Sequence, residues 1–109
     1  MVYKYDEMNK RIINSGFDVV DIYSEKSSNI DYVVVNLDGE HGNCTNSKSI
    51  KYWIILDGYA KVYLNDECNE VYQGDFVVIN KGVKHNIKGK VKFGVICTPP
   101  FDANFEKYN

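Results

Sequence analysis

The stretch from Gly74 to Gly89, GDFVVINKGVKHNIKG, constrains the fold more than any other part of the sequence. A Gly-Asp pair precedes the run 76–79, Phe-Val-Val-Ile, whose aromatic and β-branched residues favour a strand. The next four residues, Asn-Lys-Gly-Val, include types that are common in tight turns. We therefore expect His85 to begin another strand directly after a bend, where its side chain can be directed into a cavity.

Strand-like runs bounded by turn residues recur along the chain and predict about eight short strands. Turn residues separate runs in which apolar and polar residues partly alternate, and Thr98-Pro99-Pro100 ends the last run because proline cannot serve a central ladder. Asp57-Gly58 is a hairpin signal. The predicted strands are residues 17–23, 31–37, 50–56, 59–64, 68–73, 76–79, 84–88 and 90–97.

Three segments outside these runs have other predicted structures. Residues 6–15 are expected to form a short helix, with Asp6 as N-cap and Gly16 as terminator. Residues 38–48, rich in Gly, Asn and Ser, are expected to form a loop that holds His41. The tail 101–109 is expected to follow the surface.

Length and charge exclude several classes of protein. At 109 residues, the chain is expected to be one domain, 1–109. Its 13 basic and 15 acidic residues give a net charge of −2, and Arg11 is the only arginine, which argues against a nucleic-acid partner. No apolar run reaches membrane-spanning length and the N-terminal segment is charged, so we expect a cytoplasmic protein with no membrane partner. The three cysteines lack CxxC spacing and are expected to be free thiols.

Closely spaced antiparallel strands imply an all-β sandwich, barrel or jelly roll. Residues 50–56, IKYWIIL, are apolar on both faces. Such a strand is covered on both sides, either by a second layer or by another subunit, and we therefore expect a homodimer.

Two motifs resemble those of the cupin superfamily. The spacing of Gly74, five residues, Asn80, one residue, Gly82, two residues and His85 is that of the second cupin motif, with Asn80 in place of its Pro. Residues 53–58, WIILDG, look like the end of the first motif. The resemblance covers 37–102 and implies a cupin-type double-stranded β-helix, or jelly roll, of the small single-domain bacterial kind.

The departures from the cupin pattern bear on metal binding. A metal-binding cupin takes two His and a Glu from the first motif and a His from the second, and only His85 has a clear counterpart here. The Glu position falls on Lys51, a cation that would repel a divalent metal, and no His lies between 44 and 47. The resemblance therefore implies neither a metal nor another cofactor.

The same register predicts a site at the barrel mouth. Alternation along the strand points Lys51 and Trp53 inward, towards His85 on the facing strand. Asn46 and His41 lie on the rim loop. Such a concave site with a few converging polar groups suits a small polar ligand such as a sugar derivative.

Three functions compete for this site. In a metal-free sugar isomerase or epimerase, His85 is the general base, Lys51 stabilises the enolate and Trp53 stacks on the sugar. A non-catalytic binding module uses the same pocket but requires no proton transfer by these residues. A metal-dependent cupin would use His41 and His85, with their nitrogens about 3–4 Å apart. Structural explanations also exist, because Trp53 suits a core and Asn46 suits its own turn.

Overall fold

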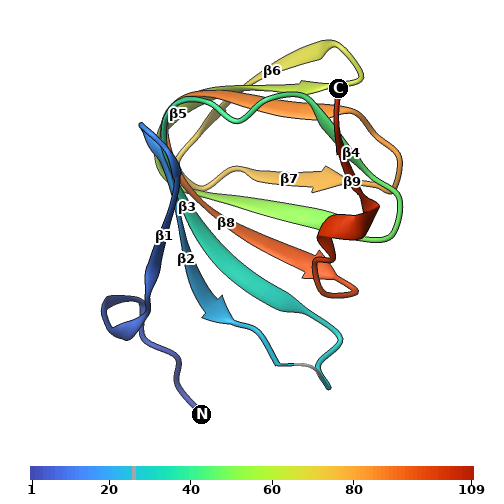
Figure 1. Ribbon diagram of the computed structural model, residues 1–109. Coiled ribbons are helices and arrows are strands. Elements are labelled where there is room, and N and C mark those ends of the chain that lie inside the picture. Colours follow the sequence, from blue (N-terminus) through green and yellow to red (C-terminus); the bar gives the residue numbers. More distant parts are fainter. Residues whose placement is uncertain (26) are drawn as a thin grey trace.

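A curled antiparallel sheet dominates the computed structural model, which describes residues 1–25 and 27–109 (Figure 1). The helical segments described are two 3-10 turns, η1 (Tyr5–Glu7) and η2 (Ala103–Phe105), and none is long and apolar enough to cross a membrane. The strands are β1 (Lys10–Asn14), β2 (Phe17–Tyr23), β3 (Asp31–Glu40), β4 (Cys44–Asn46), β5 (Ile50–Leu64), β6 (Glu67–Tyr72), β7 (Phe76–Ile79), β8 (His85–Thr98) and β9 (Glu106–Tyr108).

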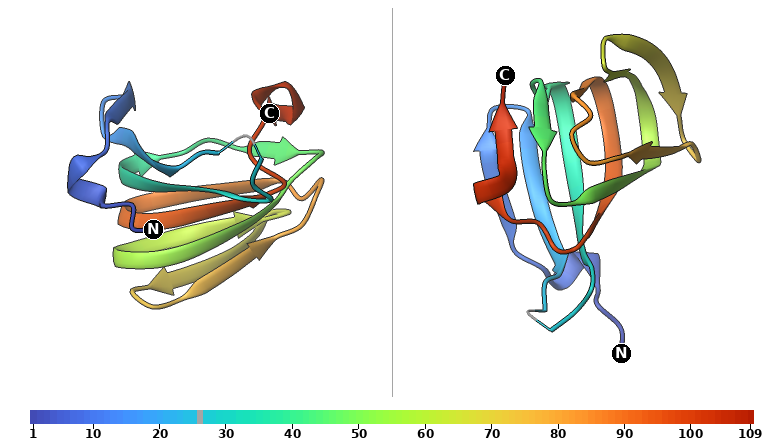
Figure 2. Two further views of the ribbon diagram at one scale, coloured as in Figure 1. Left: turned by 90° about the horizontal axis from the view of Figure 1, so that it is seen from below. Right: turned by 90° about the vertical axis from the view of Figure 1, so that its right-hand side faces the viewer.

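The long strand β8 lies at the centre of the sheet. It pairs with β3 on one side and with β5 on the other, and all these pairs are antiparallel. From β3 the sheet continues to β2 and β1, and from β5 to β6 and β7. Strand β4 meets the first residue of β8 through the pair Cys44 and His85, and β9 pairs with β4. The two views in Figure 2 show the sheet curling into a half-barrel, which confirms the predicted all-β jelly-roll architecture.

The core fills the inner face of this curl. On β5, burial alternates strictly from Ile50 to Leu56, and Lys51, Trp53 and Ile55 are only 5%, 1% and 1% exposed. The predicted inward register of β5 is therefore confirmed. Trp53 packs on Phe93 of the neighbouring strand β8 with ring centroids 5.1 Å apart, which holds the two paired strands together on the inner face.

The predicted hairpin at Asp57-Gly58 is wrong, because β5 runs on as one strand. Its register shifts at a bulge between Ile55 and Asp57, where its partner on one side changes from β7 to β6. Gly58 has φ +88°, and a Cβ there would lie 2.3 Å from the carbonyl oxygen of Lys90. The glycine thus permits a sharp bend within a paired strand. The predicted break at Gly89 is likewise a bend inside β8.

The predicted helix over 6–15 is also wrong. Only Tyr5–Glu7 makes a helical turn, and Lys10–Asn14 form β1, which pairs with the edge of β2. A helix of this length is marginal without a surface to bury against, whereas the edge of β2 satisfies the backbone directly. Ile12 and Ile13, which a helix over these residues would place on one face, are 77% and 48% exposed.

The chain between β3 and β5 and the C-terminal tail are more ordered than predicted. Residues 38–40 extend β3, and Cys44–Asn46 form β4 rather than part of a loop. The tail does not simply follow the surface, because it turns through η2 into β9 and pairs with β4 (Figure 1). This pairing carries Glu106 and Tyr108 to the open side of the barrel, where they become part of a cavity.

Candidate functional site

A cavity of about 340 Å³ lies within the curl of the sheet. Aromatic side chains supply much of its wall, and apolar residues of β2, β3 and β8 complete it. The charged and imidazole side chains on its wall are those of His41, Lys51, Glu106, Arg11, Asp21 and Asp31, of which Arg11 and Asp21 are 54% and 38% exposed. The aromatic residues are Phe17, Trp53, Phe93, Phe101 and Tyr108. A small molecule with one flat apolar face and several polar atoms would fit this surface.

Lys51 is the centre of a buried polar network. Its Nζ donates to Oε1 of Glu106 at 2.7 Å and to Nε2 of His85 at 2.9 Å. The Lys51 and Glu106 side chains are 6% and 8% exposed, and His85 is 1% exposed. A buried ammonium is stable only when it is paired with an opposite charge and hydrogen-bonded. Here Glu106 supplies the opposite charge and His85 accepts a further hydrogen bond.

His85 has both ring nitrogens engaged. Nδ1 lies 2.8 Å from the carbonyl oxygen of Val83, which can only accept, so Nδ1 carries the proton. The lone pair of Nε2 then accepts from Lys51. Burial, followed by the nearby charge of Lys51, lowers the pKa of His85 to about 4. His85 is therefore a neutral imidazole whose lone pair holds Lys51.

His41 has a different arrangement. Its Nδ1 donates to the carbonyl oxygen of Gly42 at 3.0 Å, which leaves the lone pair on Nε2. Within the described residues, Nε2 has no hydrogen-bond partner. Every buried side-chain nitrogen or oxygen of those residues does have a partner, so Nε2 is not a buried atom and is accessible. The ring stacks on Tyr108 with centroids 5.8 Å apart. Burial lowers the pKa of His41, which keeps it neutral near pH 7.

The structure brings some of the predicted site residues to the cavity and not others. Of the described residues, those lining the cavity include His41, Lys51 and Trp53 but neither His85 nor Asn46. Asn46 is 3% exposed, and its Oδ1 accepts from the backbone N–H groups of Lys48 and Ser49 at 2.9 and 2.6 Å. Its Nδ2 donates to Oε1 of Glu106 at 3.3 Å. Asn46 thus shapes the turn before β5 and orients Glu106.

Comparison with known proteins relates this architecture to solved structures. Pac13, described as a unique nucleoside dehydratase, superposes with a TM-score of 0.88 at 18% identity over 100% of this chain and 90% of its own. A predicted oxalate decarboxylase from Thermotoga maritima gives 0.82 at 16% identity, over 91% and 99%. The chain has the cupin fold. KdgF from Halomonas sp. is similar too, with a TM-score of 0.86 at 15% identity over 95% and 97%. No family model matches the sequence, and no curated protein does.

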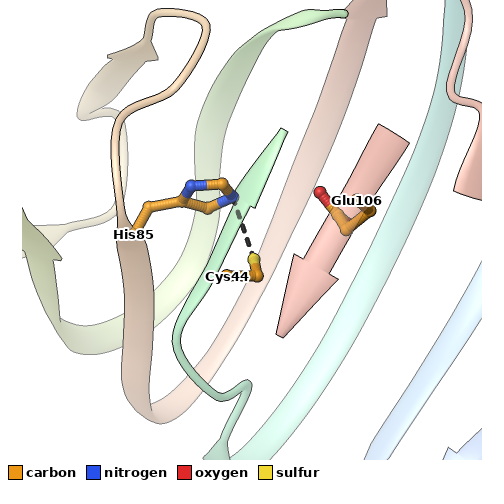
Figure 3. A group of neighbouring side chains, drawn as sticks. All are labelled: Cys44, His85 and Glu106. Carbon is orange, nitrogen blue, oxygen red and sulfur yellow. Dashed lines mark hydrogen bonds between the residues drawn. The ribbon is translucent and has the colours of Figure 1, made fainter. Parts of the chain in front are cut away.

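Proteins with this fold often hold a metal, and three side chains of this chain approach the required geometry. The ligand atoms of Cys44, His85 and Glu106 all lie within 4.8 Å of one another, and Figure 3 shows the three side chains converging. However, burial raises the pKa of Cys44 to about 11, so its sulfur is a thiol rather than a thiolate. Lys51 already occupies Nε2 of His85 and Oε1 of Glu106. The residues present do not fit a divalent metal ion.

Glu106 and Tyr108 are the site residues that sequence reasoning missed. Both come from β9, which is three residues long and lies 20 or more positions beyond His85 in the chain. No motif spacing links them to the rest of the site. The one available signal was a carboxylate in a tail that follows a proline stop, and that signal does not distinguish a buried partner for Lys51 from a solvated residue.

Proposed function

We propose that this cupin binds an uncharged sugar derivative, such as a nucleoside or free sugar, and moves a proton on it without a metal. The observation that carries the proposal is a lone pair at Nε2 of His41 and an ammonium at Lys51 on the wall of one aromatic cavity. Support for the ligand class comes from Pac13, a nucleoside dehydratase with a similar fold, because variants of Streptomyces Pac13 were solved with uridine.

The cavity's charges favour a ligand without phosphate. Its two cationic side chains are each paired with a carboxylate, Arg11 with Asp21 and Lys51 with Glu106. Asp31 adds a further carboxyl, whose pKa burial raises. Phosphate recognition generally requires cations that are available to the ligand. A neutral ligand that packs on the exposed ring of Tyr108 needs none.

For a ligand that carries a carbonyl, such as a free sugar in its open-chain form, the proposed chemistry is an enolisation. His41 takes a proton from carbon next to a carbonyl, and the electron pair of that C–H bond moves onto the carbonyl oxygen. Lys51 donates a hydrogen bond to the resulting oxyanion, while Glu106 and His85 hold the ammonium in place. Return of the proton to the same carbon from the other face gives the epimer. Return to the former carbonyl carbon gives the isomer, with the proton of the neighbouring hydroxyl passing to the oxyanion as that hydroxyl becomes the new carbonyl. This scheme moves the predicted base role from His85 to His41.

Thermal stabilisation followed by isotope exchange tests the proposal. Uridine and a panel of free aldoses and ketoses would be compared with their phosphorylated counterparts, and we expect stabilisation by the uncharged members. A stabilising carbonyl sugar would then be incubated with the protein in deuterium oxide. Proton NMR should show loss of the signal from hydrogen next to the carbonyl. Stabilisation only by phosphorylated compounds would contradict the ligand class.

A non-catalytic binding module is the second candidate. The hydrogen bonds from Lys51 to Glu106 and His85 favour it, because they restrain the ammonium that the reaction requires. This alternative predicts ligand-induced stabilisation with no deuterium incorporation for any stabilising sugar. The exchange experiment therefore separates the two functions.

We also propose that the protein is one cytoplasmic domain that forms a homodimer. The outer face of β5 and β7 supports dimerisation, because Phe76 and Val78 are 58% and 45% exposed and Tyr52 stacks on Phe76. Among the described strands, β7 pairs only with β5, which leaves one edge open. Light scattering should give twice the monomer mass, and Phe76→Ser with Val78→Ser should shift it to the monomer. A monomeric parent protein would contradict the dimer.

A further inference from the structure

The ammonium of Lys51 lies among three side chains of types that commonly hold metal ions. Its Nζ is 2.7 Å from Oε1 of Glu106 and 2.9 Å from Nε2 of His85. The sulfur of Cys44 is 3.2 Å from the same Nε2, and the three ligand atoms lie within 4.8 Å of one another (Figure 3). A cation that contacts two members of so tight a group occupies the space that a shared ion would need.

We propose that Lys51 is a built-in replacement for a divalent cation, and that Cys44, His85 and Glu106 form a latent metal site that it blocks. Removing the Lys51 side chain would open this site. Sulfur, imidazole nitrogen and carboxylate oxygen together suit Zn²⁺ or Co²⁺ in tetrahedral geometry, with a water as fourth ligand. The inference concerns the polar network of Lys51 at the cavity wall and does not depend on which ligand the cavity takes.

Charge balance explains why the lysine and the metal exclude each other. With Lys51 in place, its ammonium already neutralises the carboxylate of Glu106 at 2.7 Å. A divalent ion added to this arrangement would lie beside an ammonium in a site whose members are less than a tenth exposed, where repulsion is poorly screened. Without Lys51, the carboxylate of Glu106 and a thiolate of Cys44 would together balance the two charges of the metal.

Cobalt titration of matched lysine variants tests the proposal. The parent protein, Lys51→Ala and Lys48→Ala would each be titrated with Co²⁺ and followed by absorption. Lys48 is the control, because its side chain is 40% exposed and its Nζ lies 3.7 Å from Asp102. We expect at least tenfold tighter binding by Lys51→Ala, with a thiolate-to-cobalt band in the near ultraviolet. The double variant Lys51→Ala, Cys44→Ser should lose that band.

A second variant covers the possibility that Lys51→Ala folds poorly. Lys51→Glu supplies a fourth ligand, and its two facing carboxylates should make the metal-free form unstable. Added Zn²⁺ should then raise its thermal midpoint and leave the parent midpoint unchanged. The proposal is overturned if the parent protein shows the same cobalt–thiolate band as Lys51→Ala. It is equally overturned if neither Lys51 variant, folded or not, binds Co²⁺ or Zn²⁺ more tightly than the parent.

Discussion

The surroundings of the two histidines differ in one respect that separates a structural role from a chemical one. At His85 both ring nitrogens are engaged, Nδ1 by the carbonyl of Val83 and Nε2 by Lys51. At His41 only Nδ1 is engaged, by the carbonyl of Gly42, and Nε2 is accessible beside the cavity. Both rings are kept neutral by burial, so protonation state alone does not distinguish them.

The difference shows that the direction of a lone pair matters as much as the pKa. A general base must reach the proton it removes, within hydrogen-bond distance of the ligand. His85 carries the recognisable motif but directs its lone pair at a protein group. His41 carries no recognisable motif and leaves its lone pair accessible beside the space that a ligand would fill.

Replacing each histidine in turn should have the largest effect, which is on deuterium incorporation. The two variants would also show whether the roles assigned to His41 and His85 are wrong. His41→Asn should lower deuterium incorporation into a stabilising carbonyl sugar by about 10²–10⁴-fold, because it removes the base. Binding, followed by thermal shift, should change much less. In the parent protein, incorporation should fall with pH only below the ordinary histidine pKa of 6.5, because burial lowers the pKa of His41.

His85→Asn is the matched variant for this test. It should retain measurable exchange in whatever fraction of the protein stays folded, since His85 acts only by positioning Lys51. Loss of exchange in His85→Asn together with full exchange in His41→Asn would reverse the assignment.

Removing Lys51 should have the next largest effect, measured on stability. Lys51→Ala leaves the carboxylate of Glu106, whose side chain is 8% exposed, without its counter-charge. Breaking a buried pair in this way costs about 3–5 kcal/mol. Urea unfolding in the presence of a chelator would measure the loss. Lys48→Ala should cost less than about 1 kcal/mol, as expected for an exposed pair, and equal losses in the two variants would mean that the Lys51 network contributes little.

Local patterns were enough to predict much of the sheet. The runs 17–23 and 76–79 coincide with β2 and β7, and the inward register of β5 followed from alternation around Trp53. The errors lie where tertiary contact overrides a local signal. Gly58 and Gly89 mark bends in paired strands rather than turns, because their backbones lie against the facing strand. Nothing local distinguishes these two uses of glycine.

The site was predicted less completely than the fold. Lys51 and Trp53 were placed by strand register, which depends on neighbours in sequence. The partner of Lys51 is Glu106, and the base that the geometry favours is His41; both depend on pairings between distant segments. The direction of each histidine lone pair is set by a backbone carbonyl, of Gly42 or of Val83, and composition does not encode it.

Acid should destabilise the protein in a window set by His85. Its pKa is about 4 when folded and near 6.5 when unfolded, so the unfolded state binds the proton more readily. The resulting stability is complete above pH 6.5 and is lost as pH falls from 6.5 towards 4. The shift corresponds to roughly 3 kcal/mol. Urea midpoints measured across this range should show the loss, and His85→Asn should flatten the profile in that window apart from a smaller change due to His41.

Replacing Asn46 should have the smallest effect on stability, and it tests whether Asn46 contributes to holding Glu106 beside Lys51. Asn46→Ala removes the acceptor for the N–H groups of Lys48 and Ser49 and the donor to Glu106, and we expect a loss of about 1–2 kcal/mol in urea unfolding. Asn46→Asp separates the two contributions, because it keeps the acceptor but presents a carboxylate to Glu106. If the Glu106 contact matters, Asn46→Asp is destabilised at pH 7. If Asn46→Asp is as stable as the parent protein, Asn46 acts through its turn alone, and Lys51 by itself holds Glu106 at the cavity.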